Sequence, residues 1–239
     1  MSTAVRLAGY TLAVFLATAS FRPLVGYFGL DFFQENGPAE WIEFAVLFTV
    51  TAVFLTAARR TPRFRQLFVL LAAAAILAQF RELDAILDQT VPWLGWKIGF
   101  AVLPAAALYA RRHWATLRAQ AAEFMTTRAC GMLWGGFLIA VPIAQLVGHG
   151  PLLRLALGDN YSFAYKQMIE ETLELIGYLV IAVASVEAAL QLRAPARAVR
   201  EAAAPGPVSP AVVAFPYDRR TRPHRARPAR RPVNEKDAV

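Results

Sequence analysis

The stretch QFRELDAILD, residues 79–88, decides the fold, because it closes a long apolar run with charges that arrive too early. The uncharged run before it, residues 66–80, has about 15 residues and would make roughly 22 Å of helix. A bilayer has a hydrocarbon core about 30 Å thick, which takes about 20 helical residues to cross. If this segment spans a membrane, Arg81, Glu82 and Asp84 therefore lie at or below the membrane surface.

The rest of the chain repeats this pattern of apolar blocks and charged breaks. Its 239 residues are 57% hydrophobic, and the mean hydropathy is +0.40. A soluble domain is closer to half apolar, with its apolar residues scattered at helix or strand period. Here they come in blocks of about 15–20 residues, which is typical of a multi-pass membrane protein. The composition therefore predicts an all-α polytopic membrane protein.

Six apolar blocks predict a bundle of six transmembrane helices within residues 1–192. We expect the spans at about 7–28, 39–58, 66–87, 93–111, 129–148 and 167–192. The first block has an alternative reading, because a basic start and the small residues at 17–19 also fit a cleaved signal peptide over residues 1–19. The apolar block resumes after Pro23 and reaches spanning length, which favours a retained helix.

Most of the net charge of +8 lies in the C-terminal tail. Residues 193–239 hold eleven Lys and Arg against four acidic residues, and they are rich in Pro and Ala with no apolar period. We expect this tail to be disordered and to adhere to anionic lipid headgroups. The predicted partners are therefore the lipid bilayer and these headgroups, and no specific nucleic acid is predicted. The single cysteine, Cys130, excludes an intrachain disulfide framework and a CxxC metal site.

The distribution of basic residues predicts the orientation. Arginine gathers in the links 59–65 and 111–128 and in the tail, and the positive-inside rule places such segments in the cytoplasm. The other three links and their helix ends are rich in acids. We therefore expect a plasma-membrane protein, in the inner membrane of a Gram-negative cell, with both termini in the cytoplasm.

Length also places carboxylates of three helices at one depth. The uncharged run 44–58 is too short to cross alone, so Glu43 is drawn beneath the outer surface with Glu40 one turn above. Glu174 lies at a similar depth in the last span, and Glu171 and Tyr178 share its helix face. Ionisable side chains at this depth usually face the bundle interior and pair. The predicted outward-facing polar pocket consists of Glu40, Glu43, Arg81, Glu82, Asp84, His149, Glu171, Glu174 and Tyr178.

Three classes of function fit such a pocket: binding or processing of a lipid or small ligand, ion-coupled transport of a small solute, or a structural role with interhelical salt bridges only. If the protein is an enzyme, the catalytic candidates are Glu174, His149 and Glu43, since buried carboxylates and histidine serve as acids and bases. The chain has no nucleophile elbow, no HExxH sequence and no glycine-rich phosphate loop.

No cofactor is predicted from a strong motif, but a divalent metal ion is an alternative. Two Glu-x-x-Glu pairs, at 40–43 and 171–174, each place two carboxylates on one helix face, and His149 adds a nitrogen. Such ligands suit Mn, Fe or Ca better than structural zinc. The candidate ligands are Glu40, Glu43, His149, Glu171 and Glu174.

Five short stretches carry a resemblance to other proteins. They are ENGPAEW (35–41), RELD (81–84), WK (96–97), HG (149–150) and EETLEL (170–175). Over about residues 20–192 they resemble bacterial multi-pass membrane proteins of uncharacterised activity. The resemblance transfers no catalytic residue.

Overall fold

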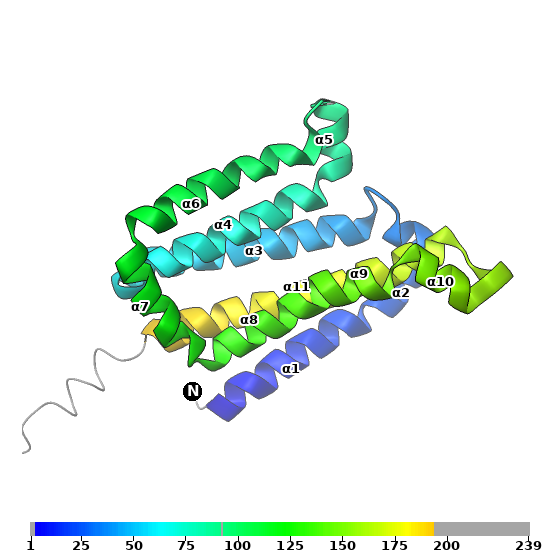
Figure 1. The fold of residues 1–239 in the computed structure, drawn as a ribbon. Coiled ribbons are helices and arrows are strands. Elements are labelled where there is room, and N and C mark those ends of the chain that lie inside the picture. Colours follow the sequence, from blue (N-terminus) through cyan, green and yellow to red (C-terminus); the bar gives the residue numbers. More distant parts are fainter. Residues whose placement is uncertain (1–2, 92, 194–239) are drawn as a thin grey trace, which may run out of the picture.

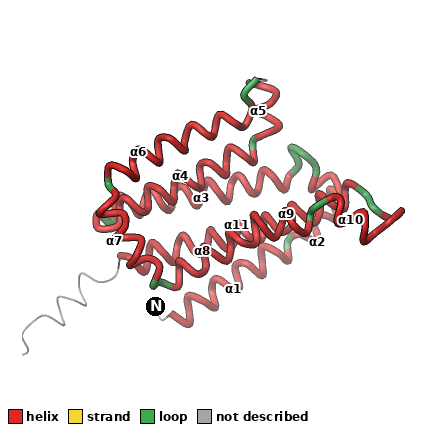
Figure 2. Tube along the Cα trace, viewed as in Figure 1, coloured by secondary structure: helices red, strands yellow, loops and turns green. Residues whose placement is uncertain are grey.

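The structure, a computed structural model, describes residues 3–91 and 93–193, and in these residues it contains helices and turns but no strand (Figures 1 and 2). This confirms the all-helical prediction. Five helical segments are long and apolar enough to cross a membrane, and a sixth is added if one bent pair counts as a single span. The five are Thr3–Phe33, Pro38–Arg60, Pro62–Glu82, Arg128–Val147 and Phe163–Arg193.

Four helices form the core. The helix α3, Pro38–Arg60, packs along α4, Arg65–Glu82, and along α11, Phe163–Arg193 (Figure 1). The helix α8, Arg128–Leu138, packs on the other side of α11. Within the described residues α4 and α8 make at most marginal contact with each other. The order α4–α3–α11–α8 is therefore an arc, and it leaves a space between its two ends.

The helix α4 is shorter than predicted. It ends at Glu82, and Leu83 departs from helical geometry with φ −105° and ψ 16°. The carboxylate of Asp84 accepts a hydrogen bond from the Ala85 N–H at 2.6 Å, and a separate helix, α5, runs over Asp84–Thr90. The predicted continuous helix 66–87 is therefore interrupted at Leu83, and residues 84–87 are helical but belong to α5. Side-chain bonds of Asp to the local backbone compete with helix continuation. Arg81 and Glu82 occupy the last turn of α4.

The fourth predicted span, 93–111, is not one straight α-helix. It begins as a 3-10 helix, η3, over Gly95–Ala101 and continues as α6, Val102–Arg112, which has no buried residue. Together, α5 and the helical segment Gly95–Arg112 are long and apolar enough for one membrane span, with a bend of 102° between them. A Cβ on Gly99 would lie 2.6 Å from the Cβ of Phe80, so this glycine lets η3 approach α4 closely.

The fifth predicted span, 129–148, contains a turn of π-helix. It comprises α8, the π-helix η4 over Ile139–Ile143, and α9 over Ala144–Val147. Pro142 lies inside η4, lacks an N–H, and clashes with the carbonyl that an α-helix would place before it. A wider turn accommodates the proline, which explains the π-helix at this point.

The remaining helices lie at the periphery. Two of them, α7 over Trp114–Met125 and α10 over Gly150–Leu157, occupy segments predicted as links. The first apolar segment comprises α1, Thr3–Ala19, then α2, Phe21–Phe28, and a 3-10 turn, η1, over Gly29–Phe33. No residue of α1 is buried, although it lies alongside α11. The predicted tail lies outside the described residues apart from Arg193.

Candidate functional site

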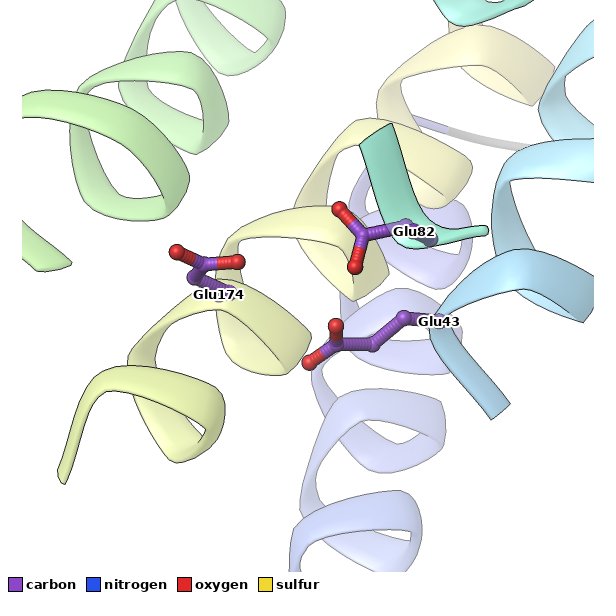
Figure 3. A group of neighbouring side chains, drawn as sticks. All are labelled: Glu43, Glu82 and Glu174. Atoms are coloured by element: carbon purple, nitrogen blue, oxygen red, sulfur yellow. The ribbon is translucent and has the colours of Figure 1, made fainter. Parts of the chain in front are cut away.

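Three buried carboxylates meet where α3, α4 and α11 come together (Figure 3). Glu43 comes from the second turn of α3, Glu82 from the end of α4, and Glu174 from α11. One oxygen of each lies within 4.8 Å of the others. Their exposed fractions are 0% for Glu43, 7% for Glu82 and 1% for Glu174. We call these three residues the acidic triad.

Two members of the acidic triad are held by hydrogen-bond donors. Arg81 bridges them, because its Nη2 donates to Glu174 and its Nε lies 3.4 Å from Oε1 of Glu82. The Tyr178 hydroxyl, one turn after Glu174 on α11, donates to the same Glu82 oxygen at 2.7 Å. The Gln145 side chain on α9 donates to Oε1 of Glu174 at 3.2 Å. These bonds hold Glu82 and Glu174 in place.

Glu43 has no such support. Both of its carboxylate oxygens are buried, and neither receives a hydrogen bond from any residue that the structure describes. Its side chain points toward Glu82 and Glu174 (Figure 3). A buried carboxylate is costly unless it is paired, so an unpartnered one beside two further carboxylates requires a positive charge or a proton close by.

A polar cavity of about 280 Å³ opens beside the triad. Glu82 belongs to both, and Arg81 contributes its side chain, which is 36% exposed. Four of the lining residues are acidic and one is basic, so the cavity has an acidic character. The lining residues are Glu40, Arg81, Glu82, Asp84, Trp96, Gln145 and Glu171.

A larger apolar cavity of about 580 Å³ fills the space between α4 and α8. Its walls come mainly from α3, α4, α8 and α11, and the small side chains of Ala74, Ala75 and Ala78 on α4 leave much of the room. Arg81 and Trp96 line this cavity as well as the polar one. The apolar and the polar cavity are therefore neighbours, with Arg81 and Trp96 in the wall between them.

The structure places most of the predicted pocket residues at this end of the bundle, in different roles. Glu40 accepts a hydrogen bond from the Asn36 N–H at 2.8 Å and lines the polar cavity. Glu171 also lines it, and one of its oxygens is buried with no hydrogen bond from the described residues. Asp84 lines it from the start of α5.

His149 lies apart from the others. It is the exposed N-cap residue of α10, and it is not among the residues lining the polar cavity. The cluster of described carboxylates that could hold a metal ion contains Glu82 and omits Glu40, His149 and Glu171, which differs from the predicted ligand set. A helix turn separates residues three apart by several ångströms along the axis, so Glu40 and Glu171 lie beyond the depth at which the triad meets.

Gln145 and Trp96 belong to the site, and neither was among the predicted pocket residues. Gln145 is a polar residue within an apolar span, and its amide bonds both Glu174 and, at 2.7 Å, Glu170. Such a residue often makes interhelical hydrogen bonds, so its position was a usable signal. Trp96 gave no comparable signal, because interfacial tryptophan is common in membrane proteins.

A second buried carboxylate lies further along α11. Glu187 is 1% exposed and accepts hydrogen bonds from Arg6 at 3.2 Å, from Tyr10 at 2.8 Å and from Gln191 at 2.6 Å. Arg6 and Tyr10 both come from α1, which buries no residue of its own. This cluster therefore ties α1 to the bundle through Glu187, although the Nε of Arg6 is buried with no acceptor among the described residues.

We expect Arg6→Gln to loosen α1. The change leaves Glu187 buried without its cation, which costs about 2 kcal/mol of the apparent free energy of unfolding in detergent. Tyr10→Phe removes one neutral donor and costs about 1 kcal/mol. The control is Arg22→Gln, which changes an exposed arginine of the same apolar segment. Equal effects of Arg6→Gln and Arg22→Gln would show that the Arg6–Glu187 pair contributes no stability.

Comparisons of the chain with protein-family models, with curated proteins and with solved structures found no match, so its function has to be argued from this site.

Proposed function

We propose that this chain is an integral membrane protein that binds an amphipathic, lipid-like molecule, with the apolar part between α4 and α8 and the polar head beside Arg81. One observation carries the proposal: Arg81 and Trp96 line both the apolar cavity of about 580 Å³ and the polar cavity of about 280 Å³. Each volume is of the order usual for ligand pockets, roughly 300–1,000 Å³. A joined apolar and polar site matches a molecule that has both parts.

The charges of the polar cavity indicate the class of headgroup. Arg81 lies at the junction with the apolar cavity, where the phosphate of a bound phospholipid would lie, and guanidinium groups bind phosphate well. The acids Glu40, Asp84 and Glu171 line the cavity with it, where they favour a positive group. A zwitterionic head with an amine beyond its phosphate fits this order of charges.

The proposal includes an orientation. The basic ends of α3 and α4, with Arg59, Arg60 and Arg65, lie at the far end of these helices from Glu43 and Glu82. By the positive-inside rule those ends face the cytoplasm, which places the headgroup site near the outer surface of the plasma membrane.

Ion-coupled transport is less well supported. A transporter needs polar groups along a path through the bundle, and the carboxylate found further along α11, Glu187, is occupied by Arg6, Tyr10 and Gln191. A purely structural role is the outcome expected if the cavities hold no ligand.

A change in the apolar cavity should remove the bound amphiphile. Ala74 lines the cavity but belongs to none of the buried core clusters, so Ala74→Phe fills space without displacing packed side chains. We expect native mass spectrometry of the wild-type protein to show a retained lipid, and Ala74→Phe to reduce that retention at least about tenfold, or roughly 1.4 kcal/mol in binding. The control is Ala107→Phe, the same change at an exposed residue of α6.

The single cysteine offers a second measurement on the same site. Cys130 lines the apolar cavity, so maleimide labelling of its thiol reports whether the cavity is filled. Lysophosphatidylethanolamine should slow the labelling more than lysophosphatidylglycerol, because the latter lacks the amine. A wild-type protein that retains no lipid and shows no protection of Cys130 would refute the proposed function.

A further inference from the structure

We infer that the acidic triad, Glu43, Glu82 and Glu174, binds one divalent cation. With all three carboxylates ionised, the triad carries three negative charges, and Arg81 supplies one positive charge beside them. Charges buried within a membrane bundle are normally paired, so two negative charges remain to be neutralised. A divalent cation neutralises both.

The geometry of the triad suits a bound ion. One oxygen from each carboxylate lies within 4.8 Å of the others, so a point between them is about 2.8 Å or less from all three, and small side-chain rotations bring such oxygens to the usual metal–oxygen distances of about 2.0–2.6 Å. Both oxygens of Glu43 are fully buried and point toward the other two carboxylates without a donor among the described residues (Figure 3). Glu43 is thus free to act as a metal ligand, while Arg81, Tyr178 and Gln145 orient the other two.

The ligand set indicates the kind of ion. All three groups are carboxylates, with no imidazole or thiolate in the cluster, and such oxygen ligands suit Mg²⁺, Mn²⁺ or Ca²⁺ rather than zinc or copper. Hydrogen bonds from second-layer residues to the ligating carboxylates are a usual feature of metal sites, and here they come from Arg81, Tyr178 and Gln145.

The ion would lie next to the proposed headgroup site. Glu82 belongs to the triad and also lines the polar cavity, which gives the ion a route of entry and places it beside any bound head. The inference does not depend on the amphiphile, because the charge balance and the unpartnered Glu43 concern the triad alone.

Manganese is a suitable probe, since it prefers oxygen ligands and its free form is seen directly by electron paramagnetic resonance. We expect the purified full chain, after treatment with a chelator, to bind one Mn²⁺ per chain and to unfold at a higher temperature when Mn²⁺ is present. Glu43→Gln removes a ligand without touching the Arg81 ion pairs, and it should weaken Mn²⁺ binding by at least about tenfold, as even the loss of outer partners of metal ligands costs 10–100-fold.

Two matched variants separate the causes. Glu123→Gln makes the same change at a half-exposed carboxylate on α7, paired with Arg63, and should leave Mn²⁺ binding unchanged. Ala74→Phe should reduce lipid retention at least about tenfold while Mn²⁺ still binds, so failure of the metal site and failure of the amphiphile site give different results. The inference is overturned if the wild type binds no Mn²⁺ and gains no thermal stability from it, or if Glu43→Gln binds Mn²⁺ as the wild type does. In those cases protons neutralise the triad.

Discussion

Arg81→Gln is expected to lower the apparent free energy of unfolding by about 3–5 kcal/mol, the largest effect of any single change considered for this protein. Arg81 is the cation for Glu174, which is 1% exposed, and for Glu82, which is 7% exposed. Removing it leaves three carboxylates together with no positive side chain among them. The measurement is denaturant titration of the purified protein in detergent, supported by its abundance in the membrane.

Three further variants test whether the loss of stability is specific to Arg81. Arg63→Gln breaks an ion pair with Glu123 whose side chains are 66% and 40% exposed, and it should cost less than about 1 kcal/mol. Arg81→Lys keeps the charge but loses the planar group that reaches two carboxylates, so its effect should be intermediate. The double variant with Glu174→Gln should recover part of the loss, because it removes one uncompensated charge. Equal losses for Arg81→Gln and Arg63→Gln would contradict the role assigned to Arg81.

Gly177→Ala is expected to cost about 3 kcal/mol, the upper end of the usual range for overpacking. Gly177 lies on α11 where it meets the π-helix η4, and a Cβ there would lie 2.5 Å from both the N and the Cβ of Ala140 and 2.7 Å from its Cα. Backbone atoms cannot rotate away, so α11 and η4 must move apart. The same titration in detergent measures the loss, and the displacement should also reduce lipid retention because Tyr178 and Ile181 line the apolar cavity.

The control for this change is Gly135→Ala on α8. A Cβ at Gly135 meets no atom within 4 Å, so alanine there adds helix propensity and should stabilise the protein by up to about 1 kcal/mol. The two Gly→Ala changes are thus expected to have opposite signs. Equal signs would show that the contact of Gly177 with Ala140 does not set the distance between α11 and η4.

The metal inference and the proposed lipid site have a common basis in the ends of three helices. Glu43 lies in the second turn of α3, Glu82 in the last turn of α4 and Glu174 in the first half of α11. The helices α3 and α11 run in the same direction and α4 runs in the opposite one, which brings these three positions to one level. Arg81 and Tyr178 beside them also line the apolar cavity. An ion at the triad would therefore lie beside the headgroup of a molecule bound between α4 and α8.

Some of this arrangement could be predicted from helix lengths alone. The rise per residue is constant, so the short uncharged runs 44–58 and 66–80 predict that Glu43 and Arg81 lie below the surface of any membrane that these helices cross. The helix α4 nevertheless ends five residues earlier than predicted, because the turn at Leu83 depends on a local bond of Asp84 that periodicity does not reveal.

Which carboxylates face each other could not be predicted. Glu40 and Glu43 share one face of α3, yet only Glu43 joins the triad, and Glu171 stays outside it while Glu174 enters. The choice depends on the rotation of each helix about its axis, which neighbouring side chains determine. The partner of Glu187 illustrates the same point, since Arg6 lies 181 residues away in the chain.

The sequence by itself determined that this is an all-helical chain with apolar spans and that charged side chains occur near one end of several of them. Both follow from composition and a constant helical rise, which act on each segment separately. Only the tertiary structure decided that Glu43, Glu82 and Glu174 meet, that Arg81 bridges two of them, and that α4 and α8 stand apart around an apolar cavity. These features depend on how helices far apart in the chain pack together, and packing depends on the shapes of all the contacting side chains at once.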